Sequence, residues 1–335
     1  MIGSYVLKVN GKDISSDIFT GKGNVITYRD NMGLVSDTLD ITLNDPNLDA
    51  ADLFPDGAEV EGEFSESLGK TLKTGKLFVD TEDGRIDSGG DAGGHEVTIG
   101  TNSQPQNRPG MKTFIAYSKK KVLLKTLLED VAKKADLNLI YRFNEFPGIP
   151  WDIELKNVLI QNEILAEVLR RYADLFGCFI KCYDEGVIFA NKLSFQTDPV
   201  LATIVPSMTS LRNFRYNVIE HNFKDYECSY YNPRTGKTTY DKKSKNSILV
   251  TQSETIKRII VQLADSTAAR AVAMAVDGQT QVQLTFDTDG TTKAIAGGVW
   301  DFKDIKKFTG KYVITSATHR IGSDWTVGIE CENIF

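Results

Sequence analysis

Apolar and polar residues alternate along the first hundred positions of the chain, and this alternation predicts β-strands. It is clearest at 37–44, where Leu39, Ile41 and Leu43 are separated by polar residues, as in a strand with one buried face. The Gly- and Asp-rich stretch 83–94 is expected to be a solvated hairpin loop. Short strands at this spacing are typical of a small barrel or sandwich. The same pattern predicts further strands at 5–9, 25–28, 59–64, 76–80 and 95–99.

The period of the pattern changes after the turn-rich segment 104–110. A first amphipathic helix is predicted around 124–134, and a second at 163–176 with Gly177 as its C-terminal cap. Alternating strands are predicted at 178–183 and 187–190, which together with the helices favour a compact α+β insert. The apolar face of the first helix comprises Leu124, Leu127, Leu128, Val131 and Ala132, and that of the second Ile164, Leu165, Val168, Leu169, Tyr172 and Phe176.

From Leu211 onward the pattern is again that of strands. A hairpin is predicted from 226–231 and 237–240, because Pro233 and Gly236 mark a turn between them. The basic run 242–245 is interpreted as a solvated strand end rather than a nucleic-acid site. A third helix is expected at 265–276, with Asp265 as N-cap and an end near Gly278. Strands are expected at 297–302, 311–315 and 324–331, with Trp325, Val327, Ile329 and Cys331 on one face.

One hairpin occurs twice, near the two ends of the chain. Thr74-Gly-Lys-Leu-Phe-Val-Asp-Thr81 matches Thr309-Gly-Lys-Tyr-Val-Ile-Thr-Ser316. In both copies a Gly-led strand comes before the hairpin and a Thr/Val/Ile strand after it. Chance similarity is the alternative, since Gly-Lys turns and β-branched strands are common. A true repeat predicts two similar β-domains in one chain, so that three chains would present six.

Length and composition favour an ordinary globular chain of several domains. Its 335 residues exceed what one core usually serves, and the predicted division is a first tube-like β-barrel at 1–104, an α+β insert at 105–200 and a second barrel at 201–335, interrupted by a helical segment at about 257–296. No stretch is long and apolar enough for a membrane helix. No secretion signal is recognised, which favours cytoplasmic synthesis. The net charge of -6 argues against nucleic-acid binding.

Seven segments occur along the chain in a characteristic order: 5–13, 37–44, 75–79, 169–177, 231–236, 310–319 and 325–330. Together they resemble the late control protein D family, the baseplate hub proteins of contractile-tailed phages and tail-like injection particles. The resemblance extends over nearly the whole chain, and the chain ends at Phe335 without the spike that larger relatives carry. It implies a homotrimer that joins the six-fold tail tube to a separate three-fold central spike, in contact with other baseplate proteins.

No set of residues predicts catalysis, a cofactor or a metal site. The three histidines, His95, His221 and His319, lie in separate regions, and a structural role at a strand end is favoured for His319. The segment 69–71 lacks the spacing of a phosphate loop, and 287–290 is interpreted as a hairpin turn rather than a calcium loop.

Four cysteines match neither a disulfide framework nor a zinc pattern. Cys178 and Cys182 are interpreted as buried reduced thiols, with a metal or redox pair as the alternative, and Cys228 and Cys331 have no close partner in the sequence.

The sequence therefore predicts a mainly β, non-enzymatic subunit of a virion or tail-like particle, assembled in the cytoplasm of a host bacterium. No catalytic, cofactor-binding or metal-binding residue is assigned, and no specific nucleic acid or membrane insertion is expected. Two alternatives stay open. One is a tail-associated enzyme that cuts the cell wall, and the other is a regulator of late transcription, against which the net charge weighs.

Overall fold

The computed structural model describes residues 2–18, 24–44, 51–66, 69–86, 95–103, 110–143, 153–183, 186–207, 209–219, 225–232, 235–244, 256–260 and 281–334. The described chain is mainly β. Its N-terminal part contains β1 (Ile2–Val9), β2 (Lys12–Asp13), α1 (Ser15–Ile18), β3 (Val25–Asn31), β4 (Thr38–Asn44), η1 (Ala51–Leu53), β5 (Glu59–Glu66), β6 (Thr71–Lys73), β7 (Leu77–Ile86) and β8 (His95–Asn102).

The middle part mixes helices and strands. Its elements are η2 (Gly110–Lys112), β9 (Phe114–Leu123), α2 (Leu124–Lys134), β10 (Asn138–Arg142), β11 (Glu154–Ile164), α3 (Leu165–Phe176), β12 (Cys178–Tyr183), β13 (Gly186–Asn191) and η3 (Lys192–Phe195). The C-terminal part contains β14 (Val200–Ile204), β15 (Arg212–Ile219), β16 (Asp225–Asn232), β17 (Lys237–Ser244), β18 (Ile256–Ile260), β19 (Gln281–Asp289), β20 (Val299–Phe302), η4 (Lys306–Phe308), β21 (Gly310–Ile321) and β22 (Trp325–Asn333).

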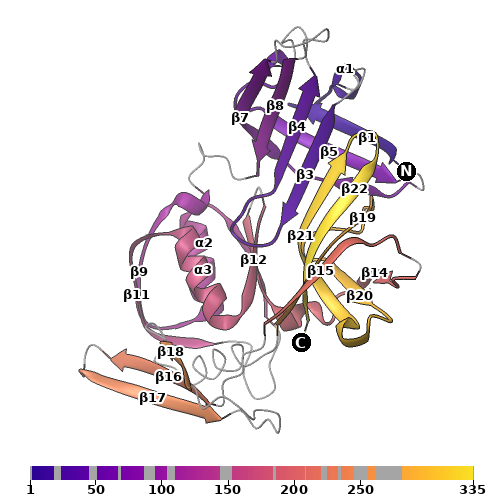
Figure 1. The fold of residues 1–335 in the computed structure, drawn as a ribbon. Helices are drawn as coiled ribbons and strands as arrows, with labels where there is room; N and C mark the ends of the chain where they lie inside the picture. Colours follow the sequence, from indigo (N-terminus) through magenta and orange to yellow (C-terminus); the bar gives the residue numbers. More distant parts are fainter. Residues whose placement is uncertain are drawn as a thin grey trace.

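A 14-stranded sheet joins the two ends of the chain. Its main path runs β15-β19-β22-β21-β3-β4-β8-β7-β5-β1-β2, with β20 on β21, β14 on β20 and β6 on β5. Figure 1 shows the N-terminal strands in indigo and purple continuing into the C-terminal strands in yellow. One hydrophobic core, which includes Leu39 and Ile99 from the first part and Phe286 and Trp300 from the second, underlies this sheet.

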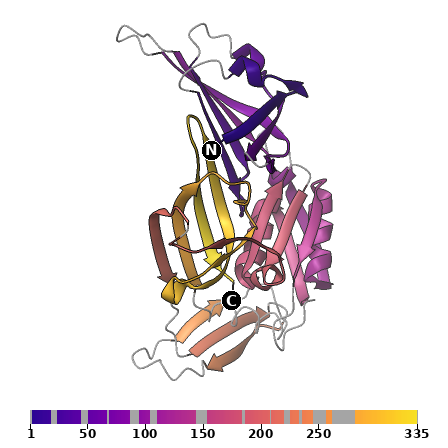
Figure 2. The same ribbon diagram turned by 90° about the vertical axis from the view of Figure 1, so that its right-hand side faces the viewer.

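The middle part has a core of its own. Helices α2 and α3 lie between the β9–β11 ribbon and the three-stranded sheet β10-β13-β12, as Figures 1 and 2 show. Both helices bury their apolar faces completely: Leu124, Leu127 and Leu128 of α2, and Val168, Leu169 and Tyr172 of α3, have no exposed area. These are the faces predicted from the 3.6-residue period. Gly177 ends α3 in the left-handed conformation (φ 58°) expected of a C-terminal cap.

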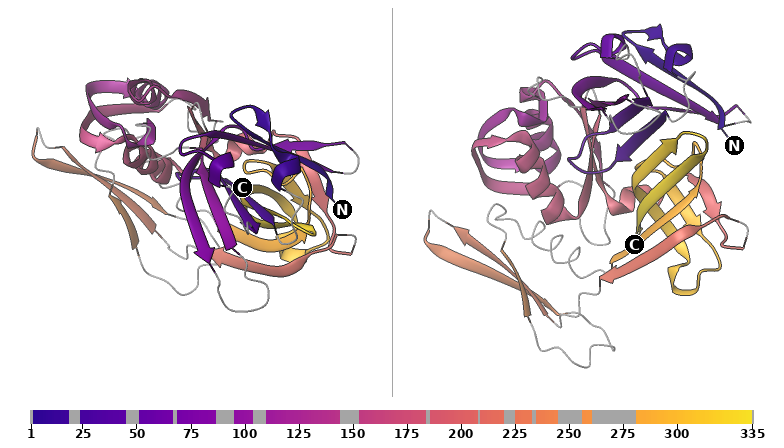
Figure 3. Two further views of the ribbon diagram at one scale, coloured as in Figure 1. Left: turned by 90° about the horizontal axis from the view of Figure 1, so that it is seen from above. Right: turned by 45° about the horizontal axis from the view of Figure 1, so that its top comes forward.

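A third group of strands stands apart from the large sheet. The predicted hairpin pairs β16 with β17 antiparallel, and β18 adds to β16 in parallel. Figure 3 shows these strands, in orange, at the periphery of the molecule. The third helix expected at 265–276, with its end near Gly278, lies outside the described residues.

Several element boundaries differ from the sequence predictions. The described residues of the helical segment expected at about 257–296 contain strands instead, since β18 and β19 occupy 256–260 and 281–289. The apolar positions of β19 have a period of two, with Leu284 and Phe286 buried, and this favours a strand. The second helix begins at Leu165 rather than at 163, because Glu163 and Ile164 still pair with β9.

The loop expected at 83–94 is shorter than its composition suggests. Residues 83–86 continue β7 and pair with β8, and 87–94 lie outside the described part. Ladder hydrogen bonds satisfy the backbone there and override the weak strand propensity of Gly and Asp. Of the segment 287–290, the first three residues are likewise the end of β19, and only Gly290 lies beyond the strand.

Candidate functional site

The large sheet is built from the same arrangement of strands used twice. We call β1, β3, β4, β5, β7 and β8 the first unit, and β14, β15, β19, β20, β21 and β22 the second unit. Neighbouring strands follow the order β3-β4-β8-β7-β5-β1 in the first and β15-β19-β22-β21-β20-β14 in the second. Strands at equivalent places in the two orders also follow one another in the same sequence along the chain. The units differ at one end, where β1 and β5 are antiparallel but β14 and β20 are parallel.

The pairing register of the repeated hairpin is the same in both units. In the first, Val60 lies opposite Leu77, and in the second Trp300 lies opposite Tyr312. Each long strand then has a register shift against its next neighbour, at Val79/Thr81 in β7 and at Ile314/Ser316 in β21. A β-bulge is a specific local feature, so its recurrence after the same Thr-Gly-Lys sequence argues against chance similarity.

The turn before each hairpin is also repeated at the level of single hydrogen bonds. Gly57 N donates to Val79 O at 3.1 Å, and Gly297 N donates to Ile314 O at 2.8 Å. Both glycines have positive φ, +71° and +86°, a conformation that favours glycine. The reciprocal bonds, Val79 N to Ala58 O and Ile314 N to Gly298 O, are 3.0 and 2.9 Å long. The two units are therefore structural copies, as the sequence repeat predicted.

The units meet where β21 of the second pairs with β3 of the first. The N-terminal half of β21 pairs with β20, and its C-terminal half pairs antiparallel with β3, from Ser316 opposite Asn31 to Ile321 opposite Ile26. Strand β22 covers the other edge of β21 along most of its length. This joint between the units is a continuous β-ladder within one chain.

Asp30 connects all three parts of the molecule at this joint. Its carboxylate is 6% exposed and forms an ion pair with Lys181 of β12 in the insert. It also accepts a hydrogen bond from Ala296 N, just before β20 of the second unit, at 2.9 Å. Asp37 lies on the far side of the same lysine, with Oδ2 3.9 Å from Lys181 Nζ. Two buried carboxylates and one ammonium thus form a shared cluster.

Asp37 is held by its own set of donors. Its Oδ1 accepts from Asn31 N at 2.9 Å, and its backbone N–H donates to Ser103 Oγ at 3.2 Å. Burial raises the pKa of Asp37 to about 7, and the negative charge of Asp30 adds to this, while Lys181 acts in the opposite direction. The charged form of a buried carboxyl is disfavoured by desolvation. Burial therefore favours the protonated form of Asp37.

His319 lies inside the joint rather than at a strand end. It is fully buried on β21, opposite Tyr28 of β3, and the two rings stack with centroids 6.0 Å apart. Its Nε2 is 2.7 Å from Ala294 O, and Trp325 Nε1 donates to its Nδ1 at 3.3 Å. Together these bonds assign the neutral tautomer with the proton on Nε2. Burial lowers the pKa of His319 to about 4, which fits a structural role.

A second contact joins the units away from the β21–β3 ladder. Glu66, at the end of β5, accepts hydrogen bonds from Thr291 Oγ1 (3.0 Å), Thr292 N (2.6 Å) and Thr292 Oγ1 (2.9 Å). Burial opposes the charge on Glu66, but these hydrogen bonds together outweigh it and lower its pKa. Charged hydrogen bonds of this kind are stronger than neutral ones. The two units are therefore fixed to each other at two separated points.

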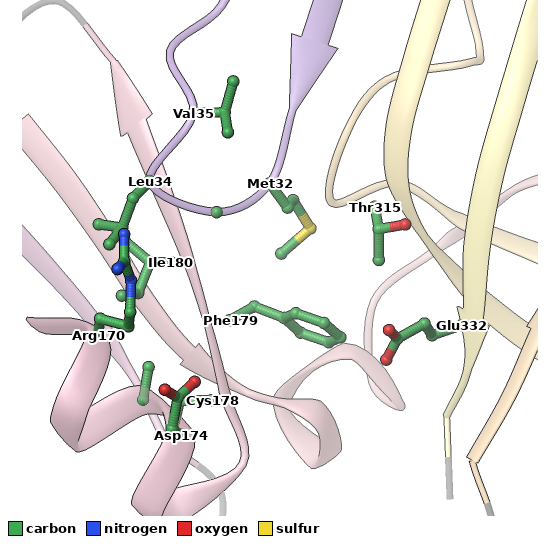
Figure 4. Close-up of a pocket in the computed structure, with 12 residues that line it drawn as sticks. Met32, Leu34, Val35, Arg170, Asp174, Cys178, Phe179, Ile180, Thr315 and Glu332 are labelled. Carbon is green, nitrogen blue, oxygen red and sulfur yellow. The ribbon is translucent and has the colours of Figure 1, made fainter. Parts of the chain in front are cut away.

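A hollow of about 370 Å³ lies between the insert and the joint. Figure 4 shows Met32 and Phe179 pointing into it, Arg170 and Asp174 approaching from α3, and Glu332 at its opposite edge. Glu332 is already paired with Lys192 at 2.7 Å. The walls come from the connection between β3 and β4, from α3 and β12, and from β21 and β22, so the hollow marks the packing seam of the insert.

The residues singled out in the sequence are not brought together. Among the described residues there is no group of three or more His, Cys, Asp and Glu that could hold a metal ion. Gly69 belongs to the connection between β5 and β6. Cys182 and Cys331 are buried free thiols. Cys178 is also a free thiol, and burial raises its pKa, although part of the residue borders the hollow.

Sequence reasoning missed Asp30, Asp37, Lys181 and Glu66. A charged residue within an otherwise alternating strand, as at Lys181 in Cys-Phe-Ile-Lys-Cys-Tyr, is a weak signal of a buried partner, and Asp30 is 151 residues away. In the part of the chain that the structure describes, no helix is long and apolar enough to cross a membrane.

Comparison with known proteins identifies the fold. The structure is similar to a tail protein from Neisseria meningitidis MC58 (TM-score 0.66, 10% identity, 98% of this chain and 97% of that chain). It is also similar to the 43 kDa tail protein of prophage MuSo2 from Shewanella oneidensis (TM-score 0.63, 14% identity, 98% and 97% covered). A third similar structure is an E. coli component of the type VI secretion system (TM-score 0.52, 11% identity, 98% and 76% covered), which itself shows structural similarity to the T4 tail proteins gp27 and gp5.

No protein-family model matches the sequence, and no curated protein matches it. The chain has the fold of phage tail proteins over almost its full length. At the level of the fold, this agrees with the resemblance to proteins of phage tails and tail-like particles noted in the sequence.

Proposed function

We propose that this protein is a structural baseplate hub subunit of a phage tail or tail-like injection particle. Three copies form a ring that continues the six-fold tail tube on one side and receives a three-fold central spike on the other. The observation that carries this proposal is the internal duplication, with its repeated strand order, bulge and turn hydrogen bonds. A trimer of a chain with two equivalent units offers six similar positions while keeping three-fold symmetry.

In this proposal the two units are the tube-like domains predicted at 1–104 and 201–335, and the α+β insert at 105–200 faces neighbouring baseplate proteins. Neither unit is closed by a strand pairing among the described residues: no ladder joins β1 to β3, or β14 to β15. Open units of this kind can complete a tube by pairing with one another. The similarity of the type VI secretion component to T4 tail proteins supports the comparison with injection particles.

The function is geometric rather than catalytic in this account. The best-organised polar clusters, around Asp30 and Glu66, are already satisfied by Lys181, Ala296 and the Thr291–Thr292 turn, and they hold units together. We propose no cofactor, and the partners are other copies of the chain, the tube protein, the spike protein and other baseplate proteins. The site of action is the particle, assembled in the cytoplasm of the host bacterium.

The proposal is tested by reconstitution. The purified chain, the tail-tube protein and the spike protein of the same particle are mixed pairwise and together, and complexes are measured by native mass spectrometry. The proposal predicts three hub chains with one spike trimer, and capping of tube ends by hub trimers. A parallel assay on purified peptidoglycan distinguishes the wall-cutting alternative, because substantial release of muropeptides by the isolated chain would contradict a purely structural role.

A further inference from the structure

The joint within the chain uses one edge of each unit and leaves the equivalent edges open. In the first unit β3 is used, and its counterpart in the second unit is β15, which among the described strands pairs only with β19. In the second unit the C-terminal half of β21 is used. Its counterpart in the first unit is the C-terminal half of β7, Thr81 to Ile86, which pairs with β8 alone in the described part of the chain.

Among the described strands, each chain therefore carries one open edge of each type. From the matched registers we infer that β7 of one copy pairs antiparallel with β15 of the next copy, repeating between chains the β21–β3 joint seen within the chain. This inference rests on the proposed hub function and specifies the interface of its trimer. An interface of this head-to-tail type closes into a ring when the rotation fits, and pairing both open edges removes sites of unwanted aggregation.

The register of the inferred interface follows from the two internal alignments. Tyr28 of β3 and Tyr216 of β15 occupy equivalent positions in the two units. In the first unit Tyr28 lies opposite Leu39 of β4, which lies opposite Thr101 of β8. In the second unit Tyr216 lies opposite Leu284 of β19, which lies opposite Cys331 of β22. In the same way Thr318 of β21 corresponds to Asp83 of β7, since they lie opposite Gly328 and Thr98 respectively. Thr318 pairs with Arg29 in the internal joint, so Asp83 is placed opposite Asn217 of the neighbouring copy.

The composition of the two edges supports a second copy as the occupant. The β7 edge carries the exposed Asp83, and β15 carries the exposed Arg215. Arg212 lies beyond the register shift of β15 and is already paired with Asp289. Arg215 is placed diagonal to Asp83, and diagonal partners in a sheet lie within reach of long side chains. Arg215 also lies directly opposite Arg85, and this one like-charge pair is unfavourable. Tyr216 is 56% exposed although it contacts Phe308, and the inferred register places it opposite Gly84, where an aromatic ring can cover a glycine backbone.

The pair Asp83 and Asn217 offers a direct test by disulfide cross-linking. Met32 and Thr315 form a hydrogen-bonded pair one position before the β21–β3 ladder, with Met32 N donating to Thr315 O. Hydrogen-bonded and non-hydrogen-bonded pairs alternate along an antiparallel ladder. Thr318 and Arg29, three positions further, therefore form a non-hydrogen-bonded pair. Such pairs have Cα atoms about 4.5 Å apart, within the range that a disulfide spans. Both Asp83 and Asn217 are exposed in the single chain, so cysteine at either position leaves the core unchanged.

The experiment compares Asp83→Cys/Asn217→Cys with three controls under mild oxidation. The first control is each single cysteine variant. The second is Asp83→Cys/Tyr216→Cys, a pair displaced by one residue from the inferred register. The third is Thr318→Cys/Arg29→Cys, the equivalent pair in the β21–β3 joint within one chain. We expect Asp83→Cys/Asn217→Cys to give covalent dimers and trimers on a non-reducing gel, at least fivefold above either single variant and reversed by reductant. The internal pair should lose two free thiols while it remains monomeric on the gel.

The outcomes separate this inference from the proposed function. Native mass spectrometry of the unmodified chain is recorded in parallel. A trimer whose Asp83/Asn217 cross-linking does not exceed that of the single variants overturns the β7–β15 interface and leaves the hub function standing. A chain that is monomeric in every condition, including with spike protein present, overturns both.

Discussion

Asp30 on β3 and Lys181 on β12 form an ion pair across 151 residues of sequence, with side chains only 6% and 16% exposed. The same Asp30 carboxylate accepts from Ala296 N of the second unit. A single buried carboxylate thus contacts both units and the insert. Because a buried charge is stable only when it is paired and hydrogen-bonded, the relative placement of the three parts depends on this residue.

Replacement of the lysine should therefore destabilise the whole chain. Lys181→Met removes the cation while Asp30 stays buried, and we expect the free energy of unfolding to fall by about 3 kcal/mol, since loss of one partner of a buried pair leaves an uncompensated charge. The measurement is urea unfolding at pH 8. Lys121→Met is the matched control, because Lys121 and Glu154 form an exposed pair that should contribute little. Equal effects of the two substitutions would contradict the structural role of the cluster.

The pKa of Asp37 predicts a pH dependence with a definite sign. Burial raises this pKa from 3.8 to about 7, so the folded chain keeps a proton that the unfolded chain releases. The resulting stabilisation is complete below pH 3.8 and is lost as the pH rises through about 7. In Asp37→Asn the side chain does not titrate, so its free energy of unfolding lacks this fall. The difference in free energy of unfolding between the variant and the natural chain should therefore shift in favour of the variant between pH 4 and pH 8, by on the order of 3 kcal/mol.

The test is thermal or urea unfolding of both chains across that pH range. Their difference isolates Asp37 from all other titrating groups. A difference that is constant from pH 4 to pH 8 would show that Asp37 titrates normally and is not part of a buried cluster.

His319 should make the joint sensitive to acid in the opposite direction. Its pKa is lowered from 6.5 to about 4 by burial, so the unfolded chain binds a proton at pH values where the folded chain does not. The stabilisation is complete above pH 6.5 and is lost as the pH falls through about 4. His319→Gln can keep one donor and one acceptor for Ala294 O and Trp325 Nε1.

In the natural chain the free energy of unfolding should fall by on the order of 3 kcal/mol between pH 6.5 and pH 4 because of His319, and we expect His319→Gln to lack this fall. The proton uptake can also be followed by NMR titration of the imidazole in the folded chain. A midpoint near 6.5 would be inconsistent with a neutral, buried His319.

Glu66 tests the second contact between the units. Glu66→Gln removes the charge that accepts from Thr291 and Thr292, and we expect lower stability at neutral pH because charged hydrogen bonds are replaced by neutral ones. The pKa of Glu66 is lowered, so this contribution is present above pH 4.5 and disappears as the pH falls below it. Hydrogen exchange in 291–292 should accelerate in the variant at pH 7, and unchanged exchange would argue against the contact.

The sequence was most informative where local chemistry determines structure. The period of 3.6 identified the buried faces of both helices, and Gly177 identified the end of one of them. The repeated Thr-Gly-Lys hairpin was visible because its turn needs glycine at positive φ in both copies, +74° at Gly75 and +143° at Gly310.

The sequence was least informative about long-range pairing. The β21–β3 ladder joins positions nearly 300 residues apart, and no local pattern specifies which edge strand meets which. The strands at β18 and β19 were obscured because Ala- and charge-rich sequence beside them favours a helix. The contacts of Asp30 and Glu66 depend on that tertiary pairing, so they could be found only in the folded chain.

The central claim is that two copies of one unit in each chain let three chains present six positions. Electron-microscopy projections of the purified assembly, viewed along its axis, test this most directly, together with its mass. We predict a closed ring with six similar lobes and three-fold symmetry, at three times the 37.2 kDa chain mass. A ring with a different number of lobes, or compact monomers in every condition including with the spike present, would contradict the account.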